Sequence, residues 1–216
     1  MNPLNILQRL LDFWKQDDET APNLFAWQTT PPRAAQTHPF PTDLPVSLRE
    51  ALTSRNISLL YSHQLTAWTH ARARRNLILA TGTASGKTLA YNLPVLAKMS
   101  EDPQARALYL FPTKALAQDQ YANLESLQSS IPFGHNVVNL KSSIYDGDTP
   151  QPHRSSIRKT ARIVLSNPDM LHTGILPHHA NWGEFFTNLK FIVIDEAHTY
   201  RGVFGSHVAN VIRRLK

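Results

Sequence analysis

Residues 76–88 read NLILATGTASGKT, and they decide the fold class of this chain. The apolar run Leu77–Ala80 leads into a turn of small residues that ends in Gly86, Lys87 and Thr88. A buried strand that delivers a Gly-Lys-Thr turn to the start of a helix forms a phosphate cradle, because free backbone N–H groups and a lysine meet the anion there. We therefore predict that this stretch binds the phosphates of a nucleotide.

A second apolar run, Phe191–Ile194, ends in the paired carboxylates Asp195 and Glu196. Taken alone, this is a charged turn after a buried strand, which many folds contain. Together with the Gly-Lys-Thr turn it is typical of a nucleotide-hydrolysing site. We expect Asp195 and the Thr88 hydroxyl to hold the Mg²⁺ that accompanies ATP, and Glu196 to deprotonate the attacking water. His198 is expected to link this strand end to other parts of a motor.

The predicted ATP-binding residues form the small-residue turn, and Lys87 also acts catalytically by neutralising the β- and γ-phosphates. These residues are Thr81, Gly82, Thr83, Ala84, Ser85, Gly86, Lys87 and Thr88. The turn departs from the usual pattern at two points. Thr81 stands where the P-loop rule has glycine, with Gly82 one residue later, and Ala84 places a Cβ within the turn.

Apolar strands alternate with helical patterns from Ser47 onward, which predicts an α/β fold with a parallel sheet covered by helices on both faces. The predicted strands are Leu77–Ala80, Ala107–Phe111, Asn136–Leu140, Arg162–Leu165 and Phe191–Ile194. Ligands bind beyond the carboxyl ends of such strands, which is where both motifs fall. Residues 1–45, a helix over 1–16 followed by a proline-rich connector, are predicted to extend a main domain over 46–216.

Composition sets weaker bounds on the class of protein. The 216 residues are 42% hydrophobic and carry a net charge of +6, which agrees with a globular domain and hints at a polyanionic partner. The chain contains no cysteine, so it forms no disulfide or cysteine-ligated metal site. No run approaches the roughly 18 apolar residues of a membrane helix, so we expect no membrane association and a cytoplasmic location.

The order of the motifs along residues 60–210 resembles that of superfamily 2 helicases of the DEAD/DEAH-box type. The segments that carry the resemblance are YSHQ at 61–64, PTKALAQDQ at 112–120, YDGDT at 145–149, SNPDM at 166–170 and DEAH at 195–198. The individual residues of these segments are similar to those of the mitomycin repair factor A helicases, which are 3′-to-5′ DNA helicases related to the fungal RecQ-like Hrq group. The resemblance implies a RecA-like P-loop NTPase lobe, ATP with Mg²⁺ as cofactors, DNA as a single strand or partial duplex, and a context of DNA repair.

The resemblance also implies roles for individual residues. Gln64 would pair with the adenine edge, with Phe40 or Tyr61 as the candidate stacking partner. Five residues are candidates for gripping the nucleic-acid backbone: Thr113, Lys114, Gly147, Ser166 and Asp169. The alternatives are ordinary structural roles, because Gln64, Thr113, Ser166 and Asp169 are all residue types that cap helices.

Two basic groups are by default solvated faces. They are Arg72, Arg74 and Arg75, and Arg154, Arg158, Lys159 and Arg162. The second group is the one that could also track phosphates.

We expect the chain to be the first lobe of a two-lobed motor, because no Ser-Ala-Thr motif III follows Asp195 and a second RecA-like lobe is missing. An absent arginine finger costs roughly 10³–10⁵ in rate in related phosphoryl transfers, so we expect little turnover from these residues alone. The alternative is a truncated, standalone module that binds nucleotide or DNA without turnover.

Overall fold

The structure of the chain is a computed structural model that describes residues 3–26, 28, 31, 34–82, 85–131 and 140–215. Two compact units make up the chain, residues 1–35 and residues 36–216. The assignment of residues 1–45 as an extension of a main domain over 46–216 stays a prediction. None of the described helices is long and apolar enough to cross a bilayer.

The first unit contains α1 (Pro3–Gln16) and the short helix η1 (Ala21–Asn23), so the predicted N-terminal helix is confirmed. Apolar side chains recur along α1 at helical spacing, but they are exposed. Leu7 is 59% exposed and Phe13 is 62% exposed. The helix therefore presents an apolar face that the unit itself does not bury.

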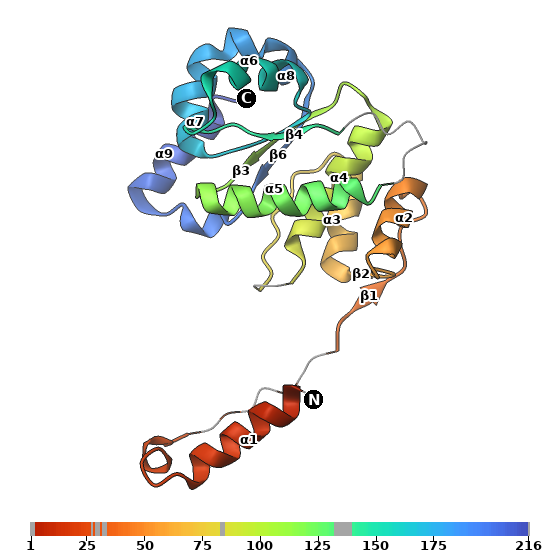
Figure 1. The fold of residues 1–216 in the computed structure, drawn as a ribbon. Helices are drawn as coiled ribbons and strands as arrows, with labels where there is room; N and C mark the ends of the chain where they lie inside the picture. The colour runs from red at the N-terminus through yellow and green to blue at the C-terminus, as the bar shows by residue number, and fades with distance from the viewer. Residues whose placement is uncertain are drawn as a thin grey trace. The chain divides into compact units, whose positions relative to one another are not determined.

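The second unit is built around a parallel sheet with strand order β4-β5-β3-β6 (Figure 1). The strands are β3 (Arg106–Leu110), β4 (Ser142–Ile144), β5 (Ile163–Ser166) and β6 (Leu189–Ile194). In the central pairings Ala107 of β3 lies opposite Ile163 of β5 and Phe191 of β6. A separate antiparallel pair joins β1 (Thr37–His38) to β2 (Leu60–Tyr61).

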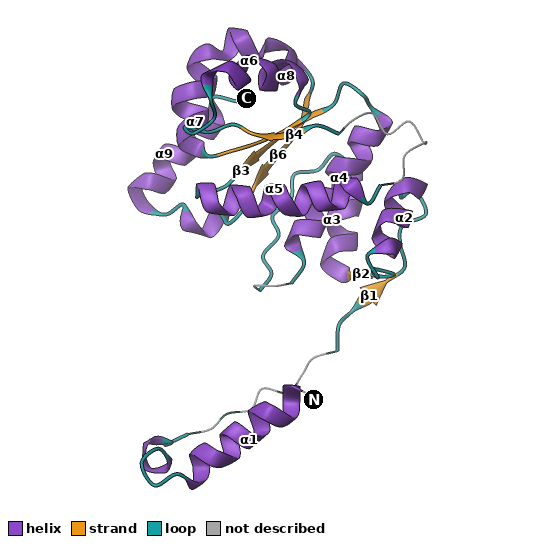
Figure 2. Cartoon of the chain, in the orientation of Figure 1, coloured by secondary structure: helices purple, strands orange, loops and turns teal. Residues whose placement is uncertain are grey.

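Helices cover both faces of this sheet, as predicted (Figure 2). Alternate residues of β3 point to opposite sides, so Tyr109 enters one core and Leu108 the other. The Tyr109 face packs against α2 (Val46–Ser54), α3 (Ser62–Arg72), α4 (Lys87–Glu101) and α5 (Lys114–Ser129). The Leu108 face packs against α6 (Gln151–Thr160), α7 (Pro168–Met170), η2 (Leu171–Ile175), η3 (Leu176–Trp182), α8 (Gly183–Thr187) and α9 (Gly202–Arg213). The remaining element, η4 (Ala197–Thr199), follows β6.

The strand predicted at Leu77–Ala80 is wrong, because these residues belong to no strand in the described part of the chain. Ile78 is 95% exposed, and β6 pairs with β3 alone among the described residues. An apolar run becomes a strand only when a ladder partner satisfies its backbone. Of the strand predicted at Asn136–Leu140, only Leu140 lies within the described residues, and the ladder there begins at Ser142.

Candidate functional site

The Gly-Lys-Thr turn opens α4 on the Tyr109 face of the sheet. Gly86 immediately precedes the helix with φ of +80°, a left-handed conformation that favours glycine. The Thr81 and Ser85 hydroxyls lie 2.7 Å apart and brace the start of the turn. Thr83 and Ala84 lie outside the described residues. The turn therefore ends at a helix N-terminus with free N–H groups, as a phosphate cradle requires.

The Lys87 side chain folds back over this turn. Its Nζ donates to the Thr81 carbonyl at 3.2 Å, so the ammonium group lies over the loop rather than in solvent. Gly82 is open, because no atom of the described residues lies within 4 Å of the position that a Cβ would take. The ammonium group and the N-terminal end of α4 therefore place positive charge where a polyphosphate would bind.

The two carboxylates follow β6 at the carboxyl end of the sheet. The Asp195 backbone N–H donates to the Leu110 carbonyl at 3.1 Å, which extends the β3–β6 ladder into the motif. Glu196 has a φ of +48°, a left-handed conformation that is sparsely populated for a residue with a side chain. His198 Nδ1 lies 3.1 Å from Glu196 Oε2, so the residue predicted to couple this site to other parts contacts the predicted base directly.

Tyr91 connects the two motifs, and sequence reasoning missed it. Its hydroxyl donates to Asp195 Oδ2 at 3.0 Å and also interacts with the Thr88 hydroxyl. Burial, followed by the negative charge of Asp195, raises the pKa of Tyr91 above its ordinary value. Thr88 and Asp195, the two predicted metal ligands, therefore converge on one phenol oxygen. The available signal was helical spacing, because Tyr91 comes one turn after Lys87 on the same face of α4.

Gln64 caps α3 and contacts the phosphate turn. Its Oε1 accepts from the Tyr61 backbone N–H at 2.9 Å, and its Nε2 donates to the Gly86 carbonyl at 3.0 Å. The side chain is 3% exposed. This is the capping alternative raised from the sequence, so a contact with adenine stays a prediction. Of the two stacking candidates, Tyr61 is 43% exposed and lies parallel to the His63 ring, whereas Phe40 packs against the core.

Three of the predicted nucleic-acid residues, Thr113, Lys114 and Gly147, lie close together and are exposed. Thr113 caps α5, where its hydroxyl accepts from the Leu116 N–H at 3.2 Å. The next residue, Lys114, places Nζ 2.6 Å from Asp148 Oδ2, and this hydrogen bond raises the pKa of Lys114. A Cβ at Gly147 would lie 3.8 Å from the same Nζ. The loop after β3 and the turn after β4 are thus side by side.

The residues after β5 separate into a buried and an exposed position. Ser166 is 1% exposed and its hydroxyl donates to the Tyr145 carbonyl at 2.6 Å, so its placement does not support direct contact of this side chain with nucleic acid. Asp169 is exposed in the first turn of α7. The capping residue there is Asn167, whose Oδ1 accepts from the Met170 N–H at 2.7 Å.

The model of the DEAD/DEAH box helicase family matches residues 61–216. The chain belongs to this family. YprA of Bacillus subtilis (strain 168), an uncharacterized ATP-dependent helicase, is 52% identical over 194 residues, which are 90% of this chain and 25% of YprA. HRQ1 of Saccharomyces cerevisiae, an ATP-dependent helicase, is 49% identical over 155 residues, which are 72% of this chain and 14% of HRQ1. The chain thus spans a quarter or less of the length of these relatives.

The crystal structure of the DUF1998 helicase MrfA bound to DNA and AMPPNP has the same fold. It superposes with a TM-score of 0.81 and 53% sequence identity, over 86% of this chain and 25% of MrfA. The DEAD-box helicase Mss116 has a TM-score of 0.68 at 20% identity, which supports the fold alone. The resemblance inferred from the motifs is confirmed, and so is the RecA-like helicase fold.

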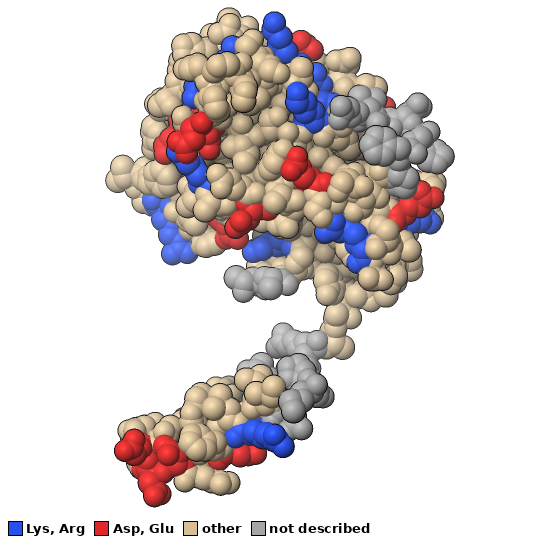
Figure 3. Space-filling view, viewed as in Figure 1, with Lys and Arg blue, Asp and Glu red and all other residues tan. Residues whose placement is uncertain are grey.

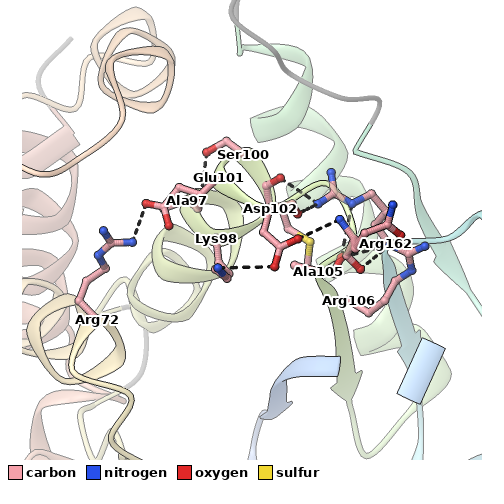
Figure 4. Close-up of polar contacts among 11 residues, drawn as sticks. Arg72, Ala97, Lys98, Ser100, Glu101, Asp102, Ala105, Arg106 and Arg162 are labelled. Carbon is pink, nitrogen blue, oxygen red and sulfur yellow. Dashed lines mark hydrogen bonds and ion pairs between the residues drawn. The ribbon is translucent and has the colours of Figure 1, made fainter. Parts of the chain in front are cut away.

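Arg162 is the main correction to the predicted basic faces of this helicase domain. Its side chain is buried, and Nη2 donates to the carbonyls of Met99 at 2.8 Å and Asp102 at 2.6 Å, at the C-terminal end of α4 (Figure 4). Burial, followed by the charge of Arg106, lowers the pKa of Arg162. Arg162 directly precedes β5, so its hydrogen bonds join the C-terminal end of α4 to the amino end of this strand. The arginine therefore stabilises the fold, and it contacts the end of α4 that is opposite the Lys87 turn.

Two further arginines of the predicted basic groups also have local partners. Arg72 forms ion pairs with Asp43 at 3.1 Å and Glu101 at 2.6 Å, and Figure 4 shows the contact with Glu101. Arg154 donates to the Thr149 carbonyl at 3.0 Å and the Asp146 carbonyl at 3.2 Å. It therefore fixes the turn after β4. On the face drawn in Figure 3, basic and acidic side chains are interspersed rather than gathered into one basic patch.

Proposed function

We propose that this chain is the ATP-binding first lobe of an ATP-dependent helicase that moves on DNA. The observation that carries the proposal is the convergence of Lys87, Thr88 and Asp195 around one end of the sheet, with Tyr91 between the last two. The relatives support the substrate class, since MrfA was crystallised with DNA and AMPPNP. The 3′-to-5′ direction and the role in repair rest on the resemblance of the motifs.

In this proposal the chain's own residues divide the work of ATP hydrolysis. The N–H groups of residues 82–87 bind the phosphates, and Lys87 leaves the Thr81 carbonyl to neutralise the β- and γ-phosphates. Glu196 takes a proton from the attacking water while its contact with His198 orients it. In this proposal the residues at the strand ends position the attacking water and stabilise the negative charge on the phosphates.

The Thr88 hydroxyl and the Asp195 carboxylate fit a magnesium ion. Both are oxygen ligands, and magnesium is typically held by one or two carboxylates together with substrate phosphates rather than by a protein cage. The described residues contain no group of three or more histidine, cysteine or acidic side chains that could form such a cage. When bound with ATP, the ion supplies charge neutralisation at the transferring phosphoryl group.

Unwinding belongs in this proposal to a longer protein. YprA and HRQ1 are four or more times longer than the matched region, so this lobe accounts for only part of each relative. We propose that a second RecA-like lobe completes both the ATP site and the DNA track. The alternative, a standalone binding module, predicts nucleotide or DNA binding with no turnover even when other lobes are supplied.

The test is a pair of substitutions that separate binding from hydrolysis. We expect Lys87→Ala to weaken Mg-ATP binding by roughly 10- to 100-fold, because hydrogen bonds to charged groups contribute about 1.5–3 kcal/mol. Glu196→Gln should leave the affinity unchanged and lower single-turnover hydrolysis by about 10²–10⁴-fold. Binding is measured with a fluorescent ATP analogue. Unchanged affinity in the Lys87 variant would refute the assignment of the nucleotide site.

A further inference from the structure

Tyr91 lies where three elements that carry motifs meet. It belongs to α4, and its hydroxyl is 3.0 Å from Asp195 Oδ2 after β6 and 3.3 Å from Gln120 Oε1 on α5. The helices α4 and α5 lie on the same face of the sheet (Figure 1). The phenol has one hydrogen and two acceptors, so it can donate to only one of them at a time.

The Tyr91 ring is held firmly in place. It meets the Tyr109 ring edge-on, with centroids 5.7 Å apart and planes at 86°. Tyr109 is fixed in turn by its hydroxyl, which donates to Asn92 Oδ1 at 2.8 Å. A phenol is protonated at neutral pH, so the Tyr91 hydroxyl acts as a donor to Asp195 or Gln120.

This donor fixes the orientation of the Asp195 carboxylate. Asp195 Oδ1 accepts from the Glu196 backbone N–H at 2.8 Å, and Oδ2 accepts from Tyr91. Each oxygen therefore has one hydrogen bond, which leaves the plane and rotation of the carboxylate defined before any ligand binds. Partners of this kind, one step removed from the ion, orient metal ligands and tune their affinity.

We propose that Tyr91 is a positioning residue for the magnesium-binding carboxylate, and that through Gln120 it links the nucleotide site to α5. The proposal rests on the proposed function. The link has a direct structural path, because α5 begins at Lys114, beside the turn after β4. When the phenol donates to Gln120 on α5, it no longer donates to Asp195, so the hydrogen bonding of both residues changes together.

A packing role alone would give a different result. Phenylalanine at this position fills the same space against Tyr109 and loses only the hydroxyl. If Tyr91 merely packs, the magnesium dependence of nucleotide binding is the same in Tyr91→Phe as in the wild type. If it positions Asp195, the magnesium dependence changes while the affinity for ATP without magnesium does not.

The experiment titrates Mg²⁺ into the full chain with a fluorescent ATP analogue. For Tyr91→Phe we expect the half-saturating Mg²⁺ concentration to rise by about 10-fold, the lower end of the range for partners of metal ligands, with affinity in EDTA unchanged. Tyr121→Phe is the matched control, since the Tyr121 hydroxyl on α5 also donates to a carboxylate, that of Glu125. The control should match the wild type. An Asp195→Asn background should abolish the effect of Tyr91→Phe.

The outcomes separate this inference from the proposed function. If the wild type binds nucleotide with magnesium and Tyr91→Phe has the same half-saturation, the inference is overturned and the proposed function stands. If the wild type shows no magnesium-dependent binding, both are overturned. Should Tyr91→Phe fail to fold, a 3-fluorotyrosine at position 91 keeps the hydroxyl. Its ¹⁹F resonance should shift when Mg²⁺ is added to the nucleotide-bound chain, and an absent shift would also overturn the inference.

Discussion

Gly86 shows how a single residue sets the geometry of the phosphate turn. It has a φ of +80°, and a Cβ there would lie 2.6 Å from Gln64 Nε2, the atom that donates to the Gly86 carbonyl. Gly86→Ala must therefore strain the backbone and displace the Gln64 cap. We expect the free energy of unfolding to fall by about 1–2 kcal/mol, the cost of a left-handed residue with a side chain. Urea denaturation measures this change.

Gly183→Ala provides the matched control. Gly183 opens α8, and no atom lies within 4 Å of the position that its Cβ would take. The substitution should leave stability unchanged or raise it by up to about 1 kcal/mol, because alanine restricts the unfolded chain. Equal destabilisation by the two substitutions would contradict the special role of the Gly86 conformation.

At the level of elements, Arg162 joins the C-terminal end of α4 to the start of β5. Its guanidinium donates to carbonyls of Met99 and Asp102, which the helix itself leaves without donors. We expect Arg162→Ala to lower the free energy of unfolding by about 2–4 kcal/mol, because the buried Met99 carbonyl loses this donor and the Asp102 carbonyl keeps only the Ala105 N–H. Lys159→Ala, at an exposed position of α6 three residues earlier, should change it by less than about 0.5 kcal/mol. A thermal or urea unfolding curve that is the same for both variants would contradict this role.

Strand prediction succeeded where burial on both faces gives a continuous apolar run. Every residue of β3 and β5 is buried, and both strands were predicted within about two residues at each end. β6 was predicted as closely from its apolar residues, although Lys190 and Ile192 are exposed. The helix α6 was missed because it has no buried residue, so its sequence lacks an apolar stripe. Arg162 was grouped with solvated arginines because a charge pattern does not reveal which helix end will lie next to it.

For the candidate site, the sequence predicted the location but not all of the side-chain partners. The motifs indicated which strand and helix ends meet, since ligands bind at the carboxyl edge of a parallel sheet. They did not reveal Tyr91, because a tyrosine near Leu89, Ala90 and Leu93 on a predicted helix is expected to be an ordinary core residue. They also did not reveal Asp148 as the partner of Lys114, since that pairing depends on how two loops far apart in sequence approach one another.

At the scale of the whole molecule, the net charge of +6 is the balance of 22 basic and 16 acidic residues. The proposed DNA binding is therefore expected to depend on where each cation lies rather than on the total charge. Lys114 is 47% exposed and paired with Asp148, at the carboxyl edge of the sheet. We expect Lys114→Gln to weaken single-stranded DNA binding and to reduce the slope of log K against log salt concentration by about 0.7, the value for one lost phosphate contact. Asp148→Asn should strengthen binding, because it frees the lysine and removes a negative charge. Fluorescence anisotropy over a salt series measures both.

Lys98→Gln separates position from total charge in this experiment. Lys98 pairs with Asp102 at 3.5 Å, and its side chain is 35% exposed, so its substitution removes the same charge from a comparable ion pair. It lies near the C-terminal end of α4, at the amino edge of the sheet, far along the helix from the Lys87 turn. We expect DNA affinity and salt slope close to those of the wild type. If Lys98→Gln and Lys114→Gln weaken DNA binding equally, net charge alone governs the binding. The region around Lys114 at the start of α5 would then not be the DNA-binding surface.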